Sequence, residues 1–300
     1  MAVMIASPYA EQLARIPVRG HRVDVDGTET AWWEYGAADA PVLVLVHGFR
    51  GDHHGLEPVV AQLPGFRIVS PDLPGFGETD TFDGRPHDIE AYAAWLAAFI
   101  ETVGITRPYV LLGHSFGSIV AAAAVARGLA PERLVLVNPI GAPALEGPRG
   151  VMTRLAVLYY RTAAALPERA GFALLRNGAI VRVMSVTMAK TRSKTLRRWI
   201  HDQHDRYFSA FGDRDAVLEA FRASVSHDVS EYARDIRVPT LLVAAERDDV
   251  TPIEAQRRLV TLFPDATLEV IPEVGHLIHY ETPGDAAARI LRFLRSGARA

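Results

Sequence analysis

A serine between two glycines offers the clearest chemistry in this chain. The string Gly113-His-Ser115-Phe-Gly117 follows the apolar run Tyr109–Leu112 and precedes an alanine-rich helical stretch. A sharp turn from a strand into a helix holds such a serine in a strained backbone conformation, with its hydroxyl exposed near the positive end of the helix. The string alone is weak, because a Gly-rich turn with a capping serine can share it. The strand and helix around it favour a nucleophilic serine.

A serine that attacks an ester creates an oxyanion, which needs two preorganised N–H donors. Phe116, the residue after the serine, supplies one backbone N–H. Phe49 follows His47-Gly48 in the turn after the apolar run Val42–Val46, and its N–H is the natural second donor. We expect His47 itself to be structural.

Asp72 follows a third apolar run, in the string DLPGFG at residues 72–77. A carboxylate directly after a strand could be a catalytic acid, but the string Asp-x-Pro-Gly is typical of a turn. We interpret Asp72 as a residue that bonds backbone N–H groups in its own loop.

Strands and helices alternate along most of the chain. Residues 21–35 alternate around Asp26-Gly27, which predicts a hairpin. Short runs rich in Val, Ile and Leu predict strands buried on both faces, and these are Val42–Val46, Arg67–Val69, Tyr109–Leu112, Leu134–Val137, Thr240–Ala244 and Thr267–Ile271. The helical candidates between them are Gly55–Leu63, Ile89–Val103, Ser118–Gly128, Ile253–Phe263 and Asp285–Leu294. This order predicts an α/β fold with a mostly parallel, doubly wound sheet.

Residues 139–235 break that rhythm. They show amphipathic helical stretches such as Val151–Ala165, Arg192–Phe211 and Asp215–Ser226, and no convincing buried strand. We interpret them as a helical insertion over the carboxyl ends of the strands, where open α/β sheets bind ligands. The predicted division is a core domain of residues 1–138 and 236–300, with a helical cap, or lid, of residues 139–235.

Five strings resemble the motif series of the α/β-hydrolase superfamily, in that family's order. They are HGF at 47–49, DLPGFG at 72–77, GHSFG at 113–117, VPTLLVAAERDDVTP at 238–252 and VGHLIHYETP at 274–283. The resemblance covers both sheet-forming segments and matches the insertion only by its position. It implies an α/β-hydrolase fold in which Ser115 is the nucleophile, Asp248 the acid and His276 the general base. Phe49 and Phe116 would form the oxyanion hole.

The acid has a neighbouring rival. The family pattern places the acid two residues after a glutamate, here Glu246, and four before a proline, here Pro252. This spacing selects Asp248, and Asp249 is the fallback. Some family members place the acid after the preceding strand, but this chain has Asn138 there and no carboxylate.

Other histidines and charges receive structural interpretations. His279 lies three residues beyond His276, and we expect it to line the pocket or support the base. The string Asp52-His53-His54 lacks further ligands at a metal-binding spacing, so no metal is expected. Part of the insertion is basic, which is typical of a solvated helix face, with recognition of an anionic substrate group as the alternative. The residues of this basic part are Arg192, Lys194, Arg197, Arg198, His201, His204 and Arg206.

A serine nucleophile favours an acyl-enzyme route, so we expect a serine hydrolase that acts on a small carboxylic ester or lactone. One alternative is hydrolysis of a C–C bond in a ring-cleavage product. Relatives with that activity tend to have a more Gly-rich loop than HGFRGDHH and an asparagine where this chain has His114. Perhydrolase, thioesterase and amidase activities are further alternatives. A non-catalytic ligand-binding role is the hypothesis from another class, and the intact Ser–Asp–His set argues against it.

Composition excludes several other classes of function and of binding partner. The 300 residues carry a formal net charge of -3 and no cysteine, which argues against a dedicated nucleic-acid binder and excludes disulfides and thiolate catalysis. No Gly-rich phosphate loop precedes a helix, so no nucleotide cofactor is expected. No apolar run approaches the roughly 20 residues of a membrane span, and no secretory signal is evident. We expect a cytoplasmic monomer or homodimer with a small-molecule substrate and without cofactor, nucleic-acid or membrane partners.

Overall fold

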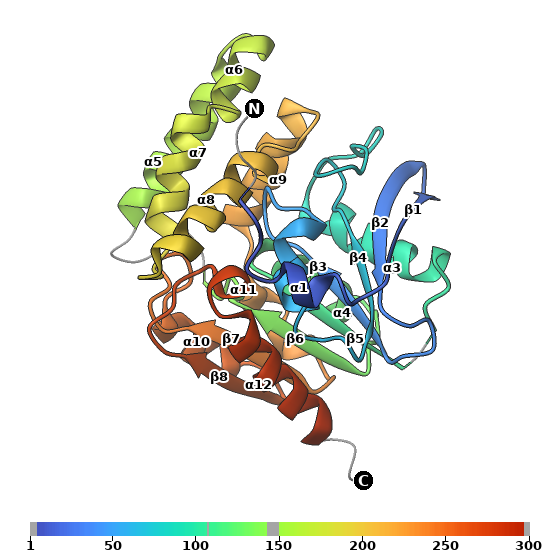
Figure 1. The fold of residues 1–300 in the computed structure, drawn as a ribbon. Coiled ribbons are helices and arrows are strands. Elements are labelled where there is room, and N and C mark those ends of the chain that lie inside the picture. The colour runs from blue at the N-terminus through green and yellow to red at the C-terminus, as the bar shows by residue number, and fades with distance from the viewer. Residues whose placement is uncertain (1–4, 107, 143–149, 297–300) are drawn as a thin grey trace.

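Eight strands form one sheet in the computed structural model of the chain, which describes residues 5–106, 108–142 and 150–296 (Figure 1). Their order across the sheet is β1-β2-β4-β3-β5-β6-β7-β8. The β1–β2 and β2–β4 pairs are antiparallel, and all the other neighbours are parallel. The strands are β1 (Val18–Val25), β2 (Thr28–Tyr35), β3 (Val42–Val46), β4 (Arg67–Pro71), β5 (Tyr109–His114), β6 (Arg133–Val137), β7 (Thr240–Ala245) and β8 (Ala266–Ile271). The predicted mostly parallel α/β sheet is confirmed.

The predicted hairpin is also present, and the backbone conformation of its turn explains why Asp and Gly occupy the turn. Asp26 and Gly27 connect β1 to β2, and both have positive φ, at 50° and 81°. A two-residue turn of this hand matches the twist of the strands and favours Asp-Gly.

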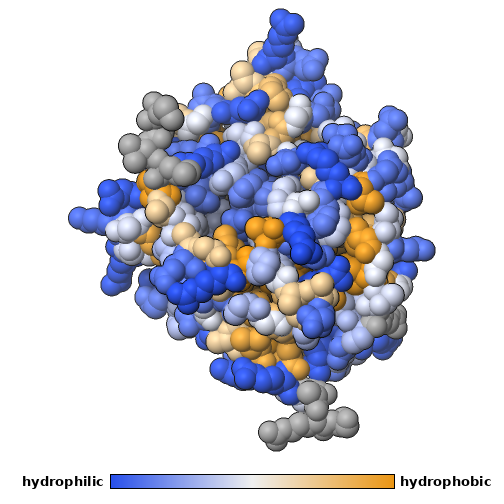
Figure 2. All heavy atoms as spheres, turned by 45° about the vertical axis from the view of Figure 1, so that its right-hand side comes forward, coloured by the Kyte–Doolittle hydropathy of each residue, from blue (hydrophilic) through white to orange (hydrophobic). Residues whose placement is uncertain are grey.

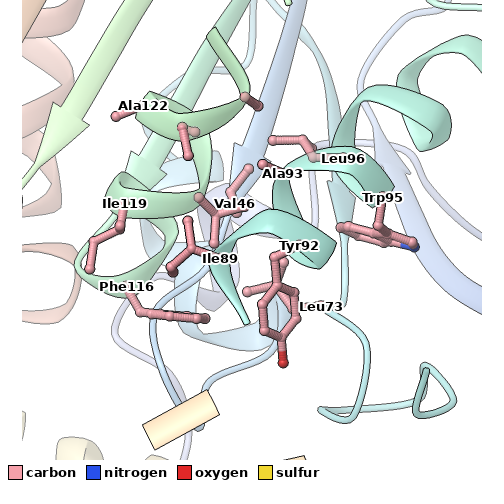
Figure 3. Close-up of a cluster of buried hydrophobic side chains, with 14 of the residues drawn as sticks. Val46, Leu73, Ile89, Tyr92, Ala93, Trp95, Leu96, Phe116, Ile119 and Ala122 are labelled. Atoms are coloured by element: carbon pink, nitrogen blue, oxygen red, sulfur yellow. The ribbon is translucent and has the colours of Figure 1, made fainter. Parts of the chain in front are cut away.

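Helices cover both faces of the sheet, as the alternation of side chains along β3 shows. Val44 and Val46 belong to the apolar cluster that contains the buried faces of α3 and α4, whereas Leu43 and Leu45 belong to the cluster on the other face, with α2 and α12. Figure 3 shows Val46 among side chains of α3 and α4. The short helices and the helices flanking the sheet are α1 (Ala10–Leu13), the 3₁₀ helix η1 (His53–Leu56), α2 (Glu57–Val60), α3 (Ile89–Thr102), α4 (Phe116–Ala126), α10 (Ile253–Val260), α11 (Ile278–Glu281) and α12 (Pro283–Ser296).

The described residues between Val137 and Thr240 contain helices and no strand. These are α5 (Gly150–Ala165), α6 (Glu168–Leu175), α7 (Gly178–Met188), α8 (Lys194–Tyr207) and α9 (Arg214–Ser226), with the 3₁₀ helices η2 (Val229–Glu231) and η3 (Ala233–Asp235). Helix α5 packs against α6, and α7 packs against α8. We call residues 150–235 the helical insertion; α5 to α8 rise from one end of the sheet, opposite α12 (Figure 1).

The sequence predicted α5, α8 and α9 but missed α6 and α7. Helix α6 is short and begins directly after Pro167. Helix α7 is rich in β-branched residues, which favour strands, and its side chain cap comes from Asn177. Within the described ranges, no helix combines the length and apolarity needed to cross a membrane.

Candidate active site

Ser115 occupies the turn between β5 and α4 in a backbone conformation that non-glycine residues rarely adopt. Its φ is 52° and its ψ is -118°. The turn is held by Ser115 N, which donates to Val137 O (3.0 Å), and by Ser115 O, which accepts from Ser118 N (2.8 Å). Gly117 is required for close packing, because a Cβ there would lie 2.3 Å from Val46 O. The glycine thus lets α4 begin against the end of β3 and leaves the serine at the carboxyl edge of the sheet.

Three residues far apart in the sequence form one hydrogen-bonded chain at this edge. His276 Nε2 lies 2.9 Å from Ser115 Oγ, and His276 Nδ1 lies 2.8 Å from Asp248 Oδ2. All three side chains are buried. The structure therefore brings together the serine, histidine and aspartate that the motif series selected.

Hydrogen bonds from the loop after β7 to both carboxylate oxygens hold Asp248 in place. Its Oδ1 accepts hydrogen bonds from Val250 N (2.7 Å) and Thr251 N (3.0 Å), and its Oδ2 accepts one from the Thr251 hydroxyl (2.5 Å). Burial by itself raises the pKa of Asp248, but the attraction of His276 and these hydrogen bonds outweigh it and lower the pKa. An ionised Asp248 accepts from His276 Nδ1–H, which leaves Nε2 as the acceptor facing Ser115.

Asn138 holds the backbone of His276 in place through hydrogen bonds, a role that the sequence did not reveal. It follows β6 with a φ of 44° and is fully buried. Its Nδ2 donates to His276 O (2.8 Å), and its Oδ1 accepts from Ala245 N (2.9 Å). One side chain thus connects the ends of β6 and β7 to the backbone of His276. Asparagine tolerates this left-handed conformation better than most residues, which is a local signal for the turn but not for the partners of the side chain.

The two rivals weighed from the sequence occupy different surroundings. Asp249 is partly exposed and forms an ion pair with Lys190 of the helical insertion. His279 is buried, and its ring centroid lies 4.2 Å from that of His114. Burial and the neighbouring histidines hold the pKa of His279 well below its ordinary value, so this imidazole is neutral.

The loop after β3 passes directly beside the serine. A Cβ on Gly48 would lie 3.3 Å from Ser115 Cβ, so the backbone there is in close approach. The rings of Phe49 and Phe116 pack edge to face, with centroids 6.2 Å apart. The structure therefore brings together the two residues predicted to donate backbone N–H groups.

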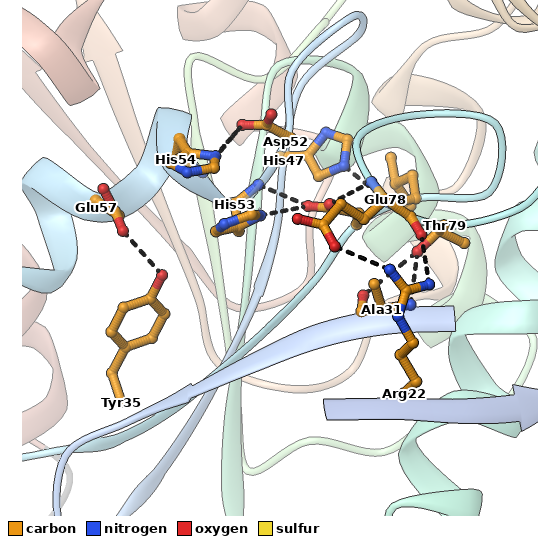
Figure 4. A network of polar contacts seen from close by, with 12 residues as sticks. Arg22, Ala31, Tyr35, His47, Asp52, His53, His54, Glu57, Glu78 and Thr79 are labelled. Atoms are coloured by element: carbon orange, nitrogen blue, oxygen red, sulfur yellow. Dashed lines mark hydrogen bonds and ion pairs between the residues drawn. The ribbon is translucent and has the colours of Figure 1, made fainter. Parts of the chain in front are cut away.

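A polar network fastens this loop to the neighbouring loop after β4 (Figure 4). His47 Nε2 accepts from Leu73 N (2.8 Å), and burial lowers the pKa of His47 so that it stays neutral and able to accept. Asp72 bonds Glu78 N of its own loop (2.9 Å), as predicted, and also His53 N of the other loop (2.8 Å). His47 and Asp72 are thus structural residues that position the segment carrying Phe49.

Arg50 fastens the same loop to the helical insertion. It follows Phe49 with a φ of 58° and is buried. Its Nε donates to Phe208 O (2.9 Å), Nη1 to the Tyr160 hydroxyl (3.2 Å) and Nη2 to Leu175 O (2.7 Å). These partners belong to three different parts of the insertion. No local sequence signal could have identified them.

Among the described residues, one cluster has side chains of the types that bind metal ions, and its donor atoms lie within 4.8 Å of one another. It consists of Asp52, His53 and His54. Each already has a structural role. Asp52 caps η1 by accepting from His54 N (3.0 Å), and the ring of His54 stacks on Tyr207. The ring of His53 stacks on Trp33, and His53 Nδ1 lies 3.0 Å from an oxygen of Asp72. Capping and stacking account for this cluster.

Comparison with known proteins identifies the class. The sequence matches the model of the alpha/beta hydrolase family over residues 43–290, and the chain belongs to this family. The protein is therefore a hydrolase with an α/β-hydrolase fold.

Individual relatives are distant. A non-heme chloroperoxidase of Burkholderia pyrrocinia is 27% identical over 271 residues, which are 84% of this chain and 90% of the relative. A thermophilic esterase from Thermogutta terrifontis has a TM-score of 0.73 at 24% identity, covering 93% of this chain and 98% of that chain. An enol-lactonase from Burkholderia xenovorans has a TM-score of 0.72 at 20% identity, covering 92% and 100%. These two structures share the fold.

Proposed function

We propose that this hydrolase cleaves a small carboxylic ester or lactone through an acyl-enzyme on Ser115. The observation that supports this proposal most directly is the hydrogen-bonded chain from Asp248 through His276 to Ser115 Oγ. A buried serine hydroxyl within 2.9 Å of an imidazole nitrogen, whose other nitrogen contacts a carboxylate, has the arrangement that nucleophilic catalysis requires.

The reaction then follows from the geometry. His276 Nε2 accepts the proton of Ser115 as Oγ bonds to the substrate carbonyl carbon, and the backbone N–H groups of Phe49 and Phe116 bind the resulting oxyanion. The intermediate collapses, the C–O bond of the ester breaks, and His276 returns the proton to the leaving alcohol. A water molecule then gives a proton to His276 as its oxygen bonds to the acyl carbon. The second intermediate collapses, the bond between the acyl carbon and Ser115 Oγ breaks, and His276 returns the proton to Oγ as the acid leaves. Asp248 stays ionised and stabilises the imidazolium.

We also propose that residues 139–235 act as a cap that shapes the substrate pocket. Tyr160 and Phe221 of the helical insertion stack with ring centroids 3.8 Å apart. Both rings lie beside Phe49, at 5.9 Å and 6.0 Å between centroids. The insertion thus packs buried aromatic rings against Phe49, and such apolar surroundings favour a substrate with an apolar acyl or alcohol group.

The test compares two buried serines that both contact imidazoles. Ser115→Ala should lower kcat on short p-nitrophenyl esters and on simple lactones by at least roughly 10³-fold. Ser185 is a matched control, because its Oγ lies 2.6 Å from His201 Nδ1 and 2.7 Å from His204 Nδ1, outside the triad. Ser185→Ala should keep its turnover, and a fluorophosphonate probe should label the native chain but not Ser115→Ala. Equal turnover by the native chain and Ser115→Ala would exclude the proposed nucleophile.

A further inference from the structure

Positive charge is concentrated in the helical insertion. Residues 154–207 contain eleven Lys and Arg but three Asp and Glu, although the whole chain has a formal net charge of -3. The rest of the chain is correspondingly acidic. In Figure 1, α5, α6 and α7 lie at the end of the molecule opposite α12 and the C-terminus. Five of the eleven basic residues, between positions 154 and 182, therefore lie far from α12, and the other six lie on α8 or directly before it.

The same insertion exposes large apolar side chains. Leu155 and Leu158 on α5, and Val183 and Val186 on α7, are between 54% and 65% exposed. Each pair is spaced by three residues and so shares one face of its helix. Soluble helices normally keep such residues on the buried face, and clustered exposed apolar residues mark an interaction surface. Figure 2 shows apolar and hydrophilic surface side by side at the upper end of the molecule, where α6 lies in Figure 1.

Helix α8 adds a basic hollow to this region. Lys194, Arg197, Arg198 and His201 line a hollow of about 470 Å³, and no acidic side chain of the described residues lines it. Their spacing of three, four and seven residues places them on one face of α8, which packs against α7. Basic side chains therefore lie close to the helix that carries Val183 and Val186.

We propose that the outer surface of α5, α7 and α8, which we call the docking face, binds the surface of an anionic phospholipid bilayer. Leucine and valine side chains enter the boundary between headgroups and acyl chains, and lysine and arginine bind the lipid phosphates. Docking of this kind needs no spanning helix. It therefore departs from the expectation of no membrane partner, which rested on the lack of a spanning segment.

Two other occupants fit the docking face less well. A nucleic acid would satisfy the basic side chains but would leave the exposed leucines and valines without an apolar partner. A second copy of this chain would cover the apolar side chains, but a symmetric contact would bring the same cationic surfaces together. An anionic bilayer satisfies both features.

The experiment measures binding of the full chain to vesicles by cosedimentation. The native chain should bind vesicles of phosphatidylcholine with about one quarter phosphatidylglycerol at least about tenfold more tightly than vesicles of phosphatidylcholine alone, and salt should weaken binding. The double variant Lys194→Glu/Arg198→Glu should weaken binding by at least about tenfold, since each basic side chain contributes roughly fivefold. Leu158→Ser/Val183→Ser should weaken binding by about tenfold through the loss of apolar burial.

Matched controls lie on the edge strand β1. Val18 is 55% exposed, comparable with the apolar residues of the docking face, and Arg19 is exposed beside it. Val18→Ser/Arg19→Glu should bind vesicles as the native chain does. Ser115→Ala should also bind normally, so a failure of docking is distinguishable from a failure of the proposed hydrolysis.

Four outcomes overturn the proposal. The native chain could show no preference for phosphatidylglycerol vesicles. The docking-face and β1 variants could weaken binding equally. Retention on DNA without vesicle binding, or a dimer that Leu158→Ser/Val183→Ser dissociates without vesicle binding, would assign the face to another partner.

Discussion

Arg50 gives the sharpest test of how the helical insertion and the sheet cooperate. Arg50→Ala removes the guanidinium that joins the loop of Phe49 to Phe208 O, Leu175 O and the Tyr160 hydroxyl. Phe208 O and the Tyr160 hydroxyl then lie at the interface without a donor, whereas Leu175 O keeps its hydrogen bond from the Tyr159 hydroxyl (3.1 Å). We expect the insertion to loosen from the sheet and the Phe49 N–H to lose its fixed position.

The magnitude can be worked from these contacts. An unpaired buried acceptor costs about 1–3 kcal/mol, so the two acceptors that lose their donor, Phe208 O and the Tyr160 hydroxyl, cost about 2–6 kcal/mol. The variant recovers part of this free energy, because burying an arginine cation costs several kcal/mol. A net loss of about 2–3 kcal/mol remains. A chain of this length has an unfolding entropy of about 0.6 kcal/mol/K, so Tm should fall by about 4 °C. Loss of one oxyanion donor lowers kcat by about 10²–10³, and a loosened donor should lower it by about tenfold.

The assay pairs thermal unfolding with ester turnover in three variants. Arg50→Lys keeps the charge, but one ammonium cannot reach the separated acceptors, so it should resemble Arg50→Ala. Arg133 is the matched control, because it is a buried arginine that donates to Phe293 O (3.1 Å). Arg133→Ala should lower Tm and leave kcat unchanged. If Arg50→Ala keeps both Tm and kcat, or if Arg133→Ala lowers kcat equally, Arg50 does not position the loop.

Three further variants test the site. Asp248→Asn should lower kcat by about 10⁴, whereas Asp249→Asn should change it less than about threefold; equal losses in ester assays would contradict the assignment of the acid. Burial is the main cause, and the charge of His276 the second, of the low pKa of His114, which is about 3 in the folded chain. Because the unfolded chain binds this proton near pH 6.5, the free energy of unfolding falls as pH drops from about 6.5 toward about 3. His114→Asn should therefore flatten the pH dependence of urea unfolding there by about 1.4 kcal/mol per pH unit, and an unchanged slope would refute this. Asn138→Ala should lower the free energy of unfolding by about 2–4 kcal/mol, since it leaves two backbone partners unpaired in a left-handed turn; a loss below about 1 kcal/mol in denaturant titration would refute that role.

The sheet was predictable because its signals are local. The runs Val42–Val46 and Thr240–Ala244 are continuous and apolar, as strands covered on both faces must be, and Asp26-Gly27 specifies its turn directly. Helix α7 was missed because its β-branched residues favour strands locally. Packing against α8 overrides that preference.

The candidate site likewise contains residues that the sequence could predict and contacts that it could not. Ser115, Asp248 and His276 each lie in a short motif, so their convergence could be predicted without coordinates. The three partners of Arg50 lie 110 to 158 residues away in the sequence, and two of them are backbone carbonyls. Asn138 likewise bonds the backbone of His276. A carbonyl carries no side-chain identity, so no sequence pattern could reveal either contact.

These contacts place Phe49 between two rigid supports. His47 and Asp72 fasten its loop to the loop after β4, and Arg50 fastens the same loop to the helical insertion. The residue proposed to bind the oxyanion therefore lies where the insertion and the sheet meet. Because the transition state depends on that N–H, a change in the packing of the insertion acts on the chemical step as well as on substrate binding. Substitutions at the contacts of Arg50 should accordingly change kcat, whereas substitutions on the outer surface of α5 and α7 should leave kcat unchanged for water-soluble esters.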